Sequence, residues 1–179
     1  MLWLTSEQVD TIIAHARDVA PHEACGILAG RDNQVNRVIP APNVADDPHH
    51  RFYIDPSALS RALSEINTAR LDLIGFYHSH PNGEPIPSTT DINEAHYPDS
   101  LQVIIGLKHQ TPKIAVWRIE RSRVMRVELH IGDFAPTHAT SHPALSTAQR
   151  NAILLSAIIA VVVMLIVSIS LLPPAPPIP

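Results

Sequence analysis

Two histidines, a serine and an aspartate in this sequence have the spacing expected of residues that gather around a metal ion. His78 and His80 end an apolar segment, and Ser88 and Asp91 follow a Pro-rich stretch. If the segment is a strand, residues two apart point to the same side, so both imidazoles can converge on one ion while Ser79 faces the other way. Asp91 is far enough along the chain to return from the loop and supply a carboxylate. The pattern therefore predicts a metal site at a strand end.

The predicted ligand set, two imidazoles and one carboxylate, is typical of a catalytic zinc site. It leaves one tetrahedral position open for water, whereas a structural site would more often use several cysteines, and this chain has only Cys25. Zinc lowers the pKa of a bound water to about 7. A hydrolase also needs a base for the water proton and a donor for the oxyanion. Glu23 is the candidate base, and the Ser88 hydroxyl is the candidate oxyanion donor.

Each of these residues also has an ordinary structural explanation. Ser88 and Asp91 alone match a helix capping box, and both roles are compatible because an aspartate in the first helical turn keeps an oxygen free for metal. His78 and His80 taken singly are ordinary strand-end histidines. The joint spacing of two histidines, a serine and an aspartate is expected by chance only about once in 10⁵ start positions. The combination therefore favours the metal site.

Cys25 offers a different chemistry, cysteine-based hydrolysis. A free cysteine in an apolar strand is far more often a small buried hydrophobic residue than a nucleophile. Its side chain is expected on the same face of the strand as Glu23. Sensitivity to a thiol alkylator but not to a zinc chelator would support this alternative.

The surrounding elements predict an α+β fold with a mixed sheet flanked by helices. A first helix is expected from the capping box of Thr5 and Gln8 to Pro21, and a second from Asp55 and Pro56. A short helix is expected to start near Ser88. Apolar segments between turn residues predict the strands, at 23–30, 35–39, 52–54, 71–80, 101–107, 114–119 and 124–131.

The chain divides by composition into a domain and an appendage. Residues 1–132 form the expected catalytic domain, 133–151 a flexible linker, 152–172 a transmembrane helix and 173–179 a Pro-rich tail. The third segment has no charged residue and at about 1.5 Å per residue reaches roughly 31 Å, near the thickness of a bilayer core. Arg150 before it, with no basic residue after it, predicts a single-pass protein with its catalytic domain in the cytoplasm.

The charge and cysteine content exclude some classes of function. The 13 basic and 17 acidic residues give a net charge of −4, which argues against a nucleic-acid surface. A single cysteine excludes an internal disulfide framework and fits a reducing compartment. The N-terminus lacks the pattern of a secretory signal. The oligomeric state is not indicated.

The complete pattern resembles the motif of the JAMM (MPN-plus) metallopeptidases. Glu23 is followed by His78-Ser79-His80-Pro81, then by Ser88 after seven residues and Asp91 after two more. The stretches EACGILAG, PNVA, FYIDP and GFYHSHP are similar to the prokaryotic branch, and the resemblance covers roughly residues 5–131. It implies a curved, cytidine-deaminase-like mixed sheet between helices, with zinc on His78, His80 and Asp91. It also implies that Glu23 is the general acid/base and that Ser88 steadies the tetrahedral intermediate.

The resemblance further implies a substrate class. Members of the family cut peptide or isopeptide bonds at the C-terminal tail of ubiquitin-like or sulfur-carrier β-grasp proteins, and the short loops here favour a prokaryotic partner. One alternative is a non-catalytic scaffold of the same fold, although no ligand is missing. Another is a DNA-repair-associated relative, although the chain has neither N-terminal DNA-binding helices nor a basic face.

Overall fold

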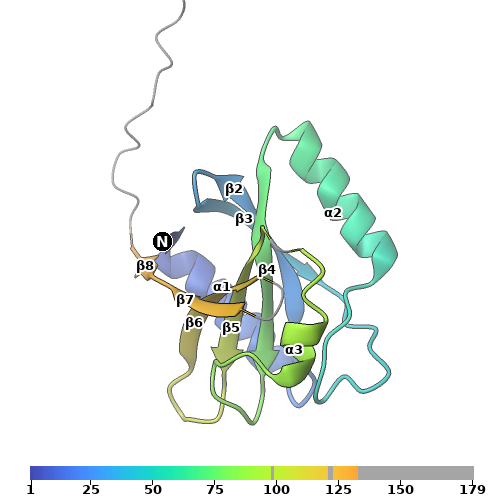
Figure 1. The fold of residues 1–179 in the computed structure, drawn as a ribbon, viewed down its shortest axis with the longest axis vertical. Coiled ribbons are helices and arrows are strands. Elements are labelled where there is room, and N and C mark those ends of the chain that lie inside the picture. Colours follow the sequence, from blue (N-terminus) through green and yellow to red (C-terminus); the bar gives the residue numbers. More distant parts are fainter. Residues whose placement is uncertain (98, 121–122, 133–179) are drawn as a thin grey trace, which may run out of the picture. The chain divides into compact units, whose positions relative to one another are not determined.

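The computed structural model describes residues 1–97, 99–120 and 123–132. Three helices and eight strands follow one another along this part of the chain (Figure 1). The helices are α1 (Ser6–Val19), α2 (Pro56–Thr68) and α3 (Thr89–Asn93). The strands are β1 (Leu2–Leu4), β2 (Cys25–Arg31), β3 (Gln34–Ala41), β4 (Asp72–His80), β5 (Leu101–Gly106), β6 (Lys113–Glu120), β7 (Arg123–Val127) and β8 (Leu129–Ile131).

The eight strands form one mixed sheet in the order β7-β6-β5-β4-β2-β3-β1-β8. β2 is antiparallel to both β3 and β4, β4 is parallel to β5, and β5, β6 and β7 are antiparallel to one another in turn. At the other edge β1 runs parallel to both β3 and β8. The predicted mixed sheet flanked by helices is confirmed.

The connection between β7 and β8 requires the sheet to be strongly curved. These strands lie at opposite ends of the strand order, yet only Glu128 separates them along the chain. A one-residue connection spans only a few ångströms, so the two edges of the sheet must come close together. The amide of Leu2 on β1 donates to the carbonyl of Glu128 at 2.8 Å. The curvature implied by the family resemblance is therefore present.

The two longer helices cover opposite faces of the sheet. Val9, Ile12 and Ala16 of α1 belong to one buried cluster, which includes Tyr77 of β4. Ala62 and Ile66 of α2 belong to the other, which includes Cys25 of β2 and Phe76 of β4. Since neighbouring residues of a strand face opposite sides, alternate side chains of β4 go to different cores. The predicted helix starts are also confirmed, because Thr5 and Asp55 are the N-caps of α1 and α2.

Three details of the strands differ from the sequence prediction. The expected strand 52–54 contributes only an isolated bridge between Ile54 and Asn43. The expected strand 124–131 is divided into β7 and β8, which pair with different edges. The three residues of β1 were not predicted, because so short a segment shows no clear alternation.

The described residues contain no helix long and apolar enough to cross a membrane. The expected linker 133–151, transmembrane helix 152–172 and tail 173–179 lie outside the residues that the structure describes.

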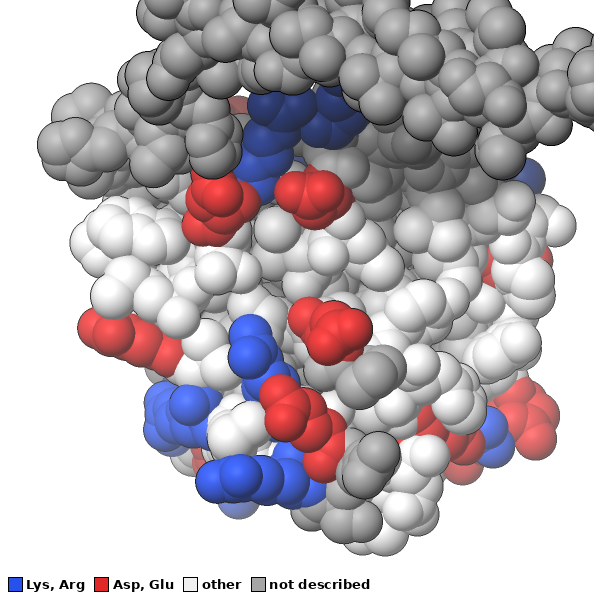
Figure 2. Space-filling view, turned by 45° about the horizontal axis from the view of Figure 1, so that its top comes forward, with Lys and Arg blue, Asp and Glu red and all other residues white. Residues whose placement is uncertain are grey.

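Charged side chains of both signs are mixed on the surface. Figure 2 shows one face on which acidic and basic residues are interspersed among uncharged ones. Several basic residues are paired, because Lys113 lies 3.3 Å from Glu84 and Arg51 lies 2.8 Å from Glu94.

Candidate active site

The site forms where the N-terminal end of β2 meets the C-terminal end of β4. The two strands are antiparallel, and Cys25 lies directly opposite His78 in their register. Glu23 precedes Cys25 by two residues, and His80 follows His78 by two. Strand pairing therefore brings Glu23 beside His80, although 56 residues lie between them in the sequence.

Three side chains bring their ligand atoms together beside Glu23. The Nε2 atoms of His78 and His80 are 3.2 Å apart, and Asp91 Oδ2 lies 3.4 Å from the first and 3.3 Å from the second. Tetrahedral bonds of about 2.0–2.1 Å place neighbouring ligand atoms roughly 3.3–3.4 Å apart. The three atoms thus fit a single tetrahedral ion, and they form the His-His-Asp group that the sequence predicted.

Neighbouring groups orient the two imidazoles. His80 Nδ1 is 3.0 Å from the Glu84 carbonyl, so it must carry the proton, which leaves the Nε2 lone pair free for a metal. His78 is fully buried and stacks on Phe52, with 4.4 Å between ring centroids and 19° between planes. Glu84 and Phe52 could not be identified as site residues from the sequence, because neither a carbonyl partner nor a stacking ring has a signature in the motif.

Asp91 and Ser88 form a capping box at the start of α3. The Ser88 amide donates to Asp91 Oδ2 at 2.6 Å, and the Asp91 amide donates to Ser88 Oγ at 3.1 Å. The same Oδ2 faces both histidines, so the cap fixes the carboxylate in its place beside them. Burial alone would raise the pKa of Asp91, but hydrogen bonds with His78 and His80 outweigh burial. The net effect is a pKa well below the usual range, so the carboxylate remains ionised. The structural role of the pair is confirmed.

The histidine pKa values follow from burial and from the same partners. Burial is the largest influence on His78 and lowers its pKa, despite the hydrogen bond with Asp91. Burial also lowers the pKa of His80, but hydrogen bonds with Asp91 and with the Glu84 carbonyl raise it above its usual value. A metal ion would require both imidazoles in the neutral form.

Glu23 is a buried carboxyl at the edge of the predicted metal site. It is only 4% exposed, and its Oε1 lies 4.0 Å from His80 Nε2. Burial raises its pKa to about 8, against attraction from His80 that lowers it. Its Oε2 is buried without a hydrogen-bond partner among the described residues, which suits an atom that handles a water proton.

Cys25 is buried and Ser79 faces away from the histidines, as the sequence predicted. Cys25 is fully buried, and burial raises the pKa of its thiol to about 12, so the thiol is unsuited to act as a nucleophile. Ser79 faces away from the two imidazoles and accepts a hydrogen bond from the Ala24 amide at 2.9 Å. The cysteine-based alternative is therefore disfavoured.

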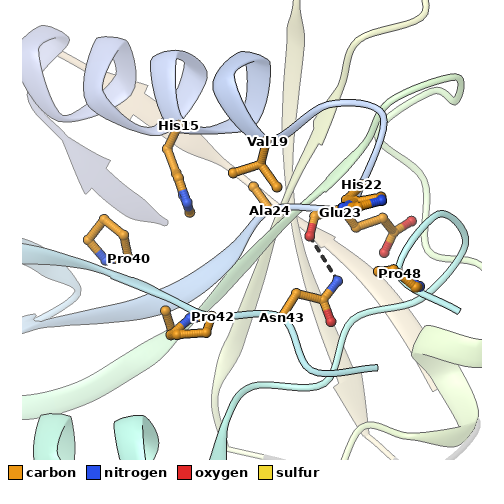
Figure 3. Close-up of a pocket in the computed structure, with 10 residues that line it drawn as sticks. His15, Val19, His22, Glu23, Ala24, Pro40, Pro42, Asn43 and Pro48 are labelled. Atoms are coloured by element: carbon orange, nitrogen blue, oxygen red, sulfur yellow. Dashed lines mark hydrogen bonds between the residues drawn. The ribbon is translucent and has the colours of Figure 1, made fainter. Parts of the chain in front are cut away.

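Two grooves adjoin the site. One, of about 570 Å³, includes Glu23 and lies between the end of α1 and the segment around Pro42 and Pro48 (Figure 3). The other, of about 830 Å³, includes Asp91. It has a largely aromatic and polar lining, which includes Phe52, Tyr53, Phe76, Tyr97 and Gln102. The reactive groups thus border two surfaces able to receive a substrate.

The chain belongs to the family of prokaryotic homologs of the JAB domain, whose model matches residues 5–120. The solved structures agree with this assignment. A protein from Desulfitobacterium hafniense is 31% identical with a TM-score of 0.69, covering 77% of this chain and 97% of that protein. A JAB1/MPN domain protein from Archaeoglobus fulgidus shares the fold at 16% identity and a TM-score of 0.50, covering 74% of this chain and 98% of that one.

Three relatives are enzymes by name. A desampylase of Haloferax volcanii is 38% identical over 58% of this chain and 78% of its own length. A probable TtuB-protein conjugate cleaving protease of Thermus thermophilus is 45% identical over 47% of this chain and 56% of its own length. A CysO-cysteine peptidase of Mycobacterium tuberculosis is 32% identical over 60% of this chain and 75% of its own length. Together with the His-His-Asp group, they confirm the prediction of an enzyme of the metallopeptidase type.

Proposed function

We propose that this protein is a zinc-dependent peptidase or isopeptidase that cuts the C-terminal tail of a ubiquitin-like or sulfur-carrier β-grasp protein. The observation that carries the proposal is the spacing of His78, His80 and Asp91, whose ligand atoms are 3.2–3.4 Å apart beside the buried Glu23. A lone capping box or a structural histidine pair does not require that geometry. A scaffold without metal would not need it either.

The proposed mechanism assigns one role to each side chain. A bound zinc ion would act as a Lewis acid and lower the pKa of a water molecule. Glu23 takes a proton from the attacking water and delivers it to the leaving amine. Burial favours the protonated form of its carboxyl and raises the pKa to about 8 in the metal-free site, so the carboxyl can hold the proton between the two transfers. The oxygen of the Ser88 hydroxyl already accepts one hydrogen bond, and the hydroxyl donates a hydrogen bond to the developing oxyanion.

The substrate class rests on the relatives and on the grooves. One relative is named a desampylase, another a probable TtuB-protein conjugate cleaving protease and the third a CysO-cysteine peptidase, and these names favour a protein conjugate or a peptide as the substrate. The groove beside Asp91 offers aromatic faces and the polar side chains of Thr90 and Gln102. Such a surface suits an extended peptide tail, which needs apolar contacts and hydrogen bonds along its length.

Membrane tethering is a separate part of the proposal. It rests on the uncharged stretch 152–172 and on Arg150 before it, which together favour a C-terminal anchor with the catalytic domain in the cytoplasm. Fractionation of cells that express the full chain or a chain ending at residue 151 tests it. The full chain is expected in the membrane fraction after a high-salt wash, and an equal distribution of both chains would contradict the anchor.

The cleavage experiment uses the full chain in detergent, loaded with zinc. The probe is a sulfur-carrier β-grasp protein extended past its terminal Gly-Gly, and mass spectrometry of the products reports cleavage after that pair. We expect cleavage that a chelator abolishes and added zinc restores. Glu23→Gln is the matched variant, expected to keep zinc while the rate falls about 10²–10⁴-fold. A protein that binds zinc but leaves every such probe intact would favour the scaffold.

A further inference from the structure

The backbone that carries Glu23 is held by four hydrogen bonds outside the regular strand. The Glu23 amide donates to the Pro48 carbonyl at 2.7 Å, and the Glu23 carbonyl accepts from Asn43 Nδ2 at 2.9 Å (Figure 3). The Ala24 amide donates to Ser79 Oγ at 2.9 Å, and the Ala24 carbonyl accepts from the Ser79 amide at 2.9 Å. Two of the four bonds therefore depend on side chains, those of Asn43 and Ser79.

The Asn43 amide uses its full hydrogen-bonding capacity. Besides the Glu23 carbonyl, Nδ2 donates to the Arg51 carbonyl at 3.1 Å. Oδ1 accepts from the amides of Ala45 at 3.0 Å and Tyr53 at 2.9 Å. An asparagine side chain has two N–H donors and an oxygen with two lone pairs, so all four positions are filled. One side chain thus joins Glu23 to both ends of the 45–53 segment.

The segment that Asn43 holds contacts both halves of the proposed machinery. Its Pro48 carbonyl accepts the Glu23 amide, and its Phe52 ring stacks on the predicted ligand His78. Asn43 itself lines the groove that includes Glu23. A loss of the Asn43 bonds would therefore act first on the backbone from which the Glu23 carboxylate projects.

We propose that Asn43 and Ser79 are positioning residues, which fix the Glu23–Ala24 backbone so that the carboxylate stays about 4 Å from His80 Nε2. This inference rests on the proposed function. Neither side chain touches the reacting atoms, so both act through Glu23. A misplacement of about 1 Å at a reacting group can cost roughly 100-fold in rate.

Asn43→Asp is the sharpest test, because it keeps the size of the side chain and both acceptor positions while it removes the two N–H donors. The negative charge that it adds is absent from Ser79→Ala, for which the same loss is expected. A carboxylate can still accept from Ala45 and Tyr53, but it cannot donate to the carbonyls of Glu23 and Arg51. With the extended β-grasp probe, we expect kcat to fall about 100-fold while KM and bound zinc stay unchanged. In a Glu23→Gln background the same change is expected to have no further effect on the residual rate, since the group it positions is absent.

Gln8→Ala is the matched control, because Gln8 is another side-chain amide that bridges backbone groups, far from Glu23. It donates to the Val35 carbonyl and accepts from the Thr5 amide. It is expected to lower the free energy of unfolding without changing kcat. If Asn43→Asp does not fold, Ser79→Ala takes its place, with the same expected loss of kcat.

The outcomes separate the inference from the proposed function. Wild-type kcat in a folded Asn43→Asp or Ser79→Ala variant would overturn the inference, as would an equal loss in the wild-type and Glu23→Gln backgrounds. A wild-type protein that holds zinc but cleaves no extended β-grasp probe would overturn the proposed function, and the inference with it. Loss of kcat confined to the background that contains Glu23 supports both.

Discussion

At the scale of single residues, two opposing influences act on the pKa of Glu23. Burial removes water from its carboxyl and favours the neutral form, while the neighbouring His80 favours the ionised form. Burial prevails, and the pKa rises to about 8. The carboxyl is thus poised to gain and lose a proton near neutral pH, as the proposed mechanism needs. The same property makes the stability of the metal-free fold depend on pH.

The first prediction concerns this pH dependence. In the unfolded chain Glu23 ionises near its usual pKa of 4.5, but in the fold it stays protonated to about pH 8. The contribution of Glu23 to the free energy of unfolding is therefore fully present below pH 4.5. It is lost as the pH rises to about 8, by an amount on the order of 3–5 kcal/mol. Glu23→Gln cannot ionise and should avoid this loss. Urea unfolding with a chelator present, at pH 5 and pH 9, measures the difference.

The comparison between the two proteins isolates Glu23, because every other titrating group is common to both. The stability of the wild type relative to Glu23→Gln should fall between pH 5 and pH 9. A constant difference across this range would show that burial does not hold the proton on Glu23.

The second prediction separates the two roles of Ser88. Ser88→Ala removes the N-cap of α3, which should cost about 1 kcal/mol, and also the proposed oxyanion donor, which should lower kcat about 10²–10³-fold. Thr5→Ala removes the equivalent cap of α1, whose capping box with Gln8 has the same arrangement. Thr5→Ala should lower the free energy of unfolding by a similar amount, while its kcat stays at the wild-type value. Equal kcat values for the two variants would leave Ser88 with a capping role alone.

The spacing of the sequence could predict four of the site residues, and Glu23 was added mainly through the family resemblance. His78, His80, Ser88 and Asp91 satisfy the motif, and the structure brings the ligand atoms of the histidines and the aspartate together. Asn43 could not be identified in this way, because an asparagine after a proline is ordinarily a turn residue. Only its bond from the Ala45 amide is local, and the other three, with Glu23, Arg51 and Tyr53, form only when the chain has folded.

At the scale of elements, the loop between β4 and α3 is tied closely to the sheet. The carbonyl of His80 accepts from the amides of Gly83 at 3.2 Å and Leu107 at 3.0 Å. Further along, the Trp117 indole donates to the Pro85 carbonyl at 2.9 Å. These bonds give the predicted ligand His80 a rigid support, although the loop has no regular secondary structure.

The third prediction follows from the close approach of Gly83 to His80. A Cβ added to Gly83 would lie 2.9 Å from the His80 Cβ, which is too close, so one of the two must shift. Gly83→Ala should therefore displace His80 and weaken zinc binding about 10–100-fold, as changes to the supports of metal ligands commonly do. Competition with a chromogenic chelator measures the affinity. Asn82→Ala, at an exposed position of the same loop, is the control. Equal affinity in the two variants would mean that the loop yields without moving His80.

Most elements were predictable because their signals are local. Capping residues identified the helix starts, and apolar segments identified β2 to β6. The predicted strand 52–54 was wrong because the Tyr53 amide bonds to the Asn43 side chain instead of to a neighbouring strand. The split between β7 and β8 was not visible, because it depends on which edge of the sheet each segment joins.

At the scale of the whole molecule, the order of the strands creates the site. β2 and β4 are neighbours although β3 and α2 intervene between them in sequence, and their antiparallel pairing puts Glu23 beside the histidines. The α3 helix then returns Asp91 to the same end of β4. No local pattern specifies that order, and it was not predicted from the sequence. The membrane segment stays a prediction, because 152–172 lies outside the described residues.

The amount of zinc bound per chain tests the central claim most directly. Elemental analysis of the purified full chain should find about one zinc in the wild type, and close to none after Asp91→Asn. Asp46→Asn is the control, because that carboxylate is 87% exposed and outside the ligand group, and it should keep the full amount. A wild type without zinc, or an Asp91→Asn variant that retains it, would contradict a metal centre made of His78, His80 and Asp91.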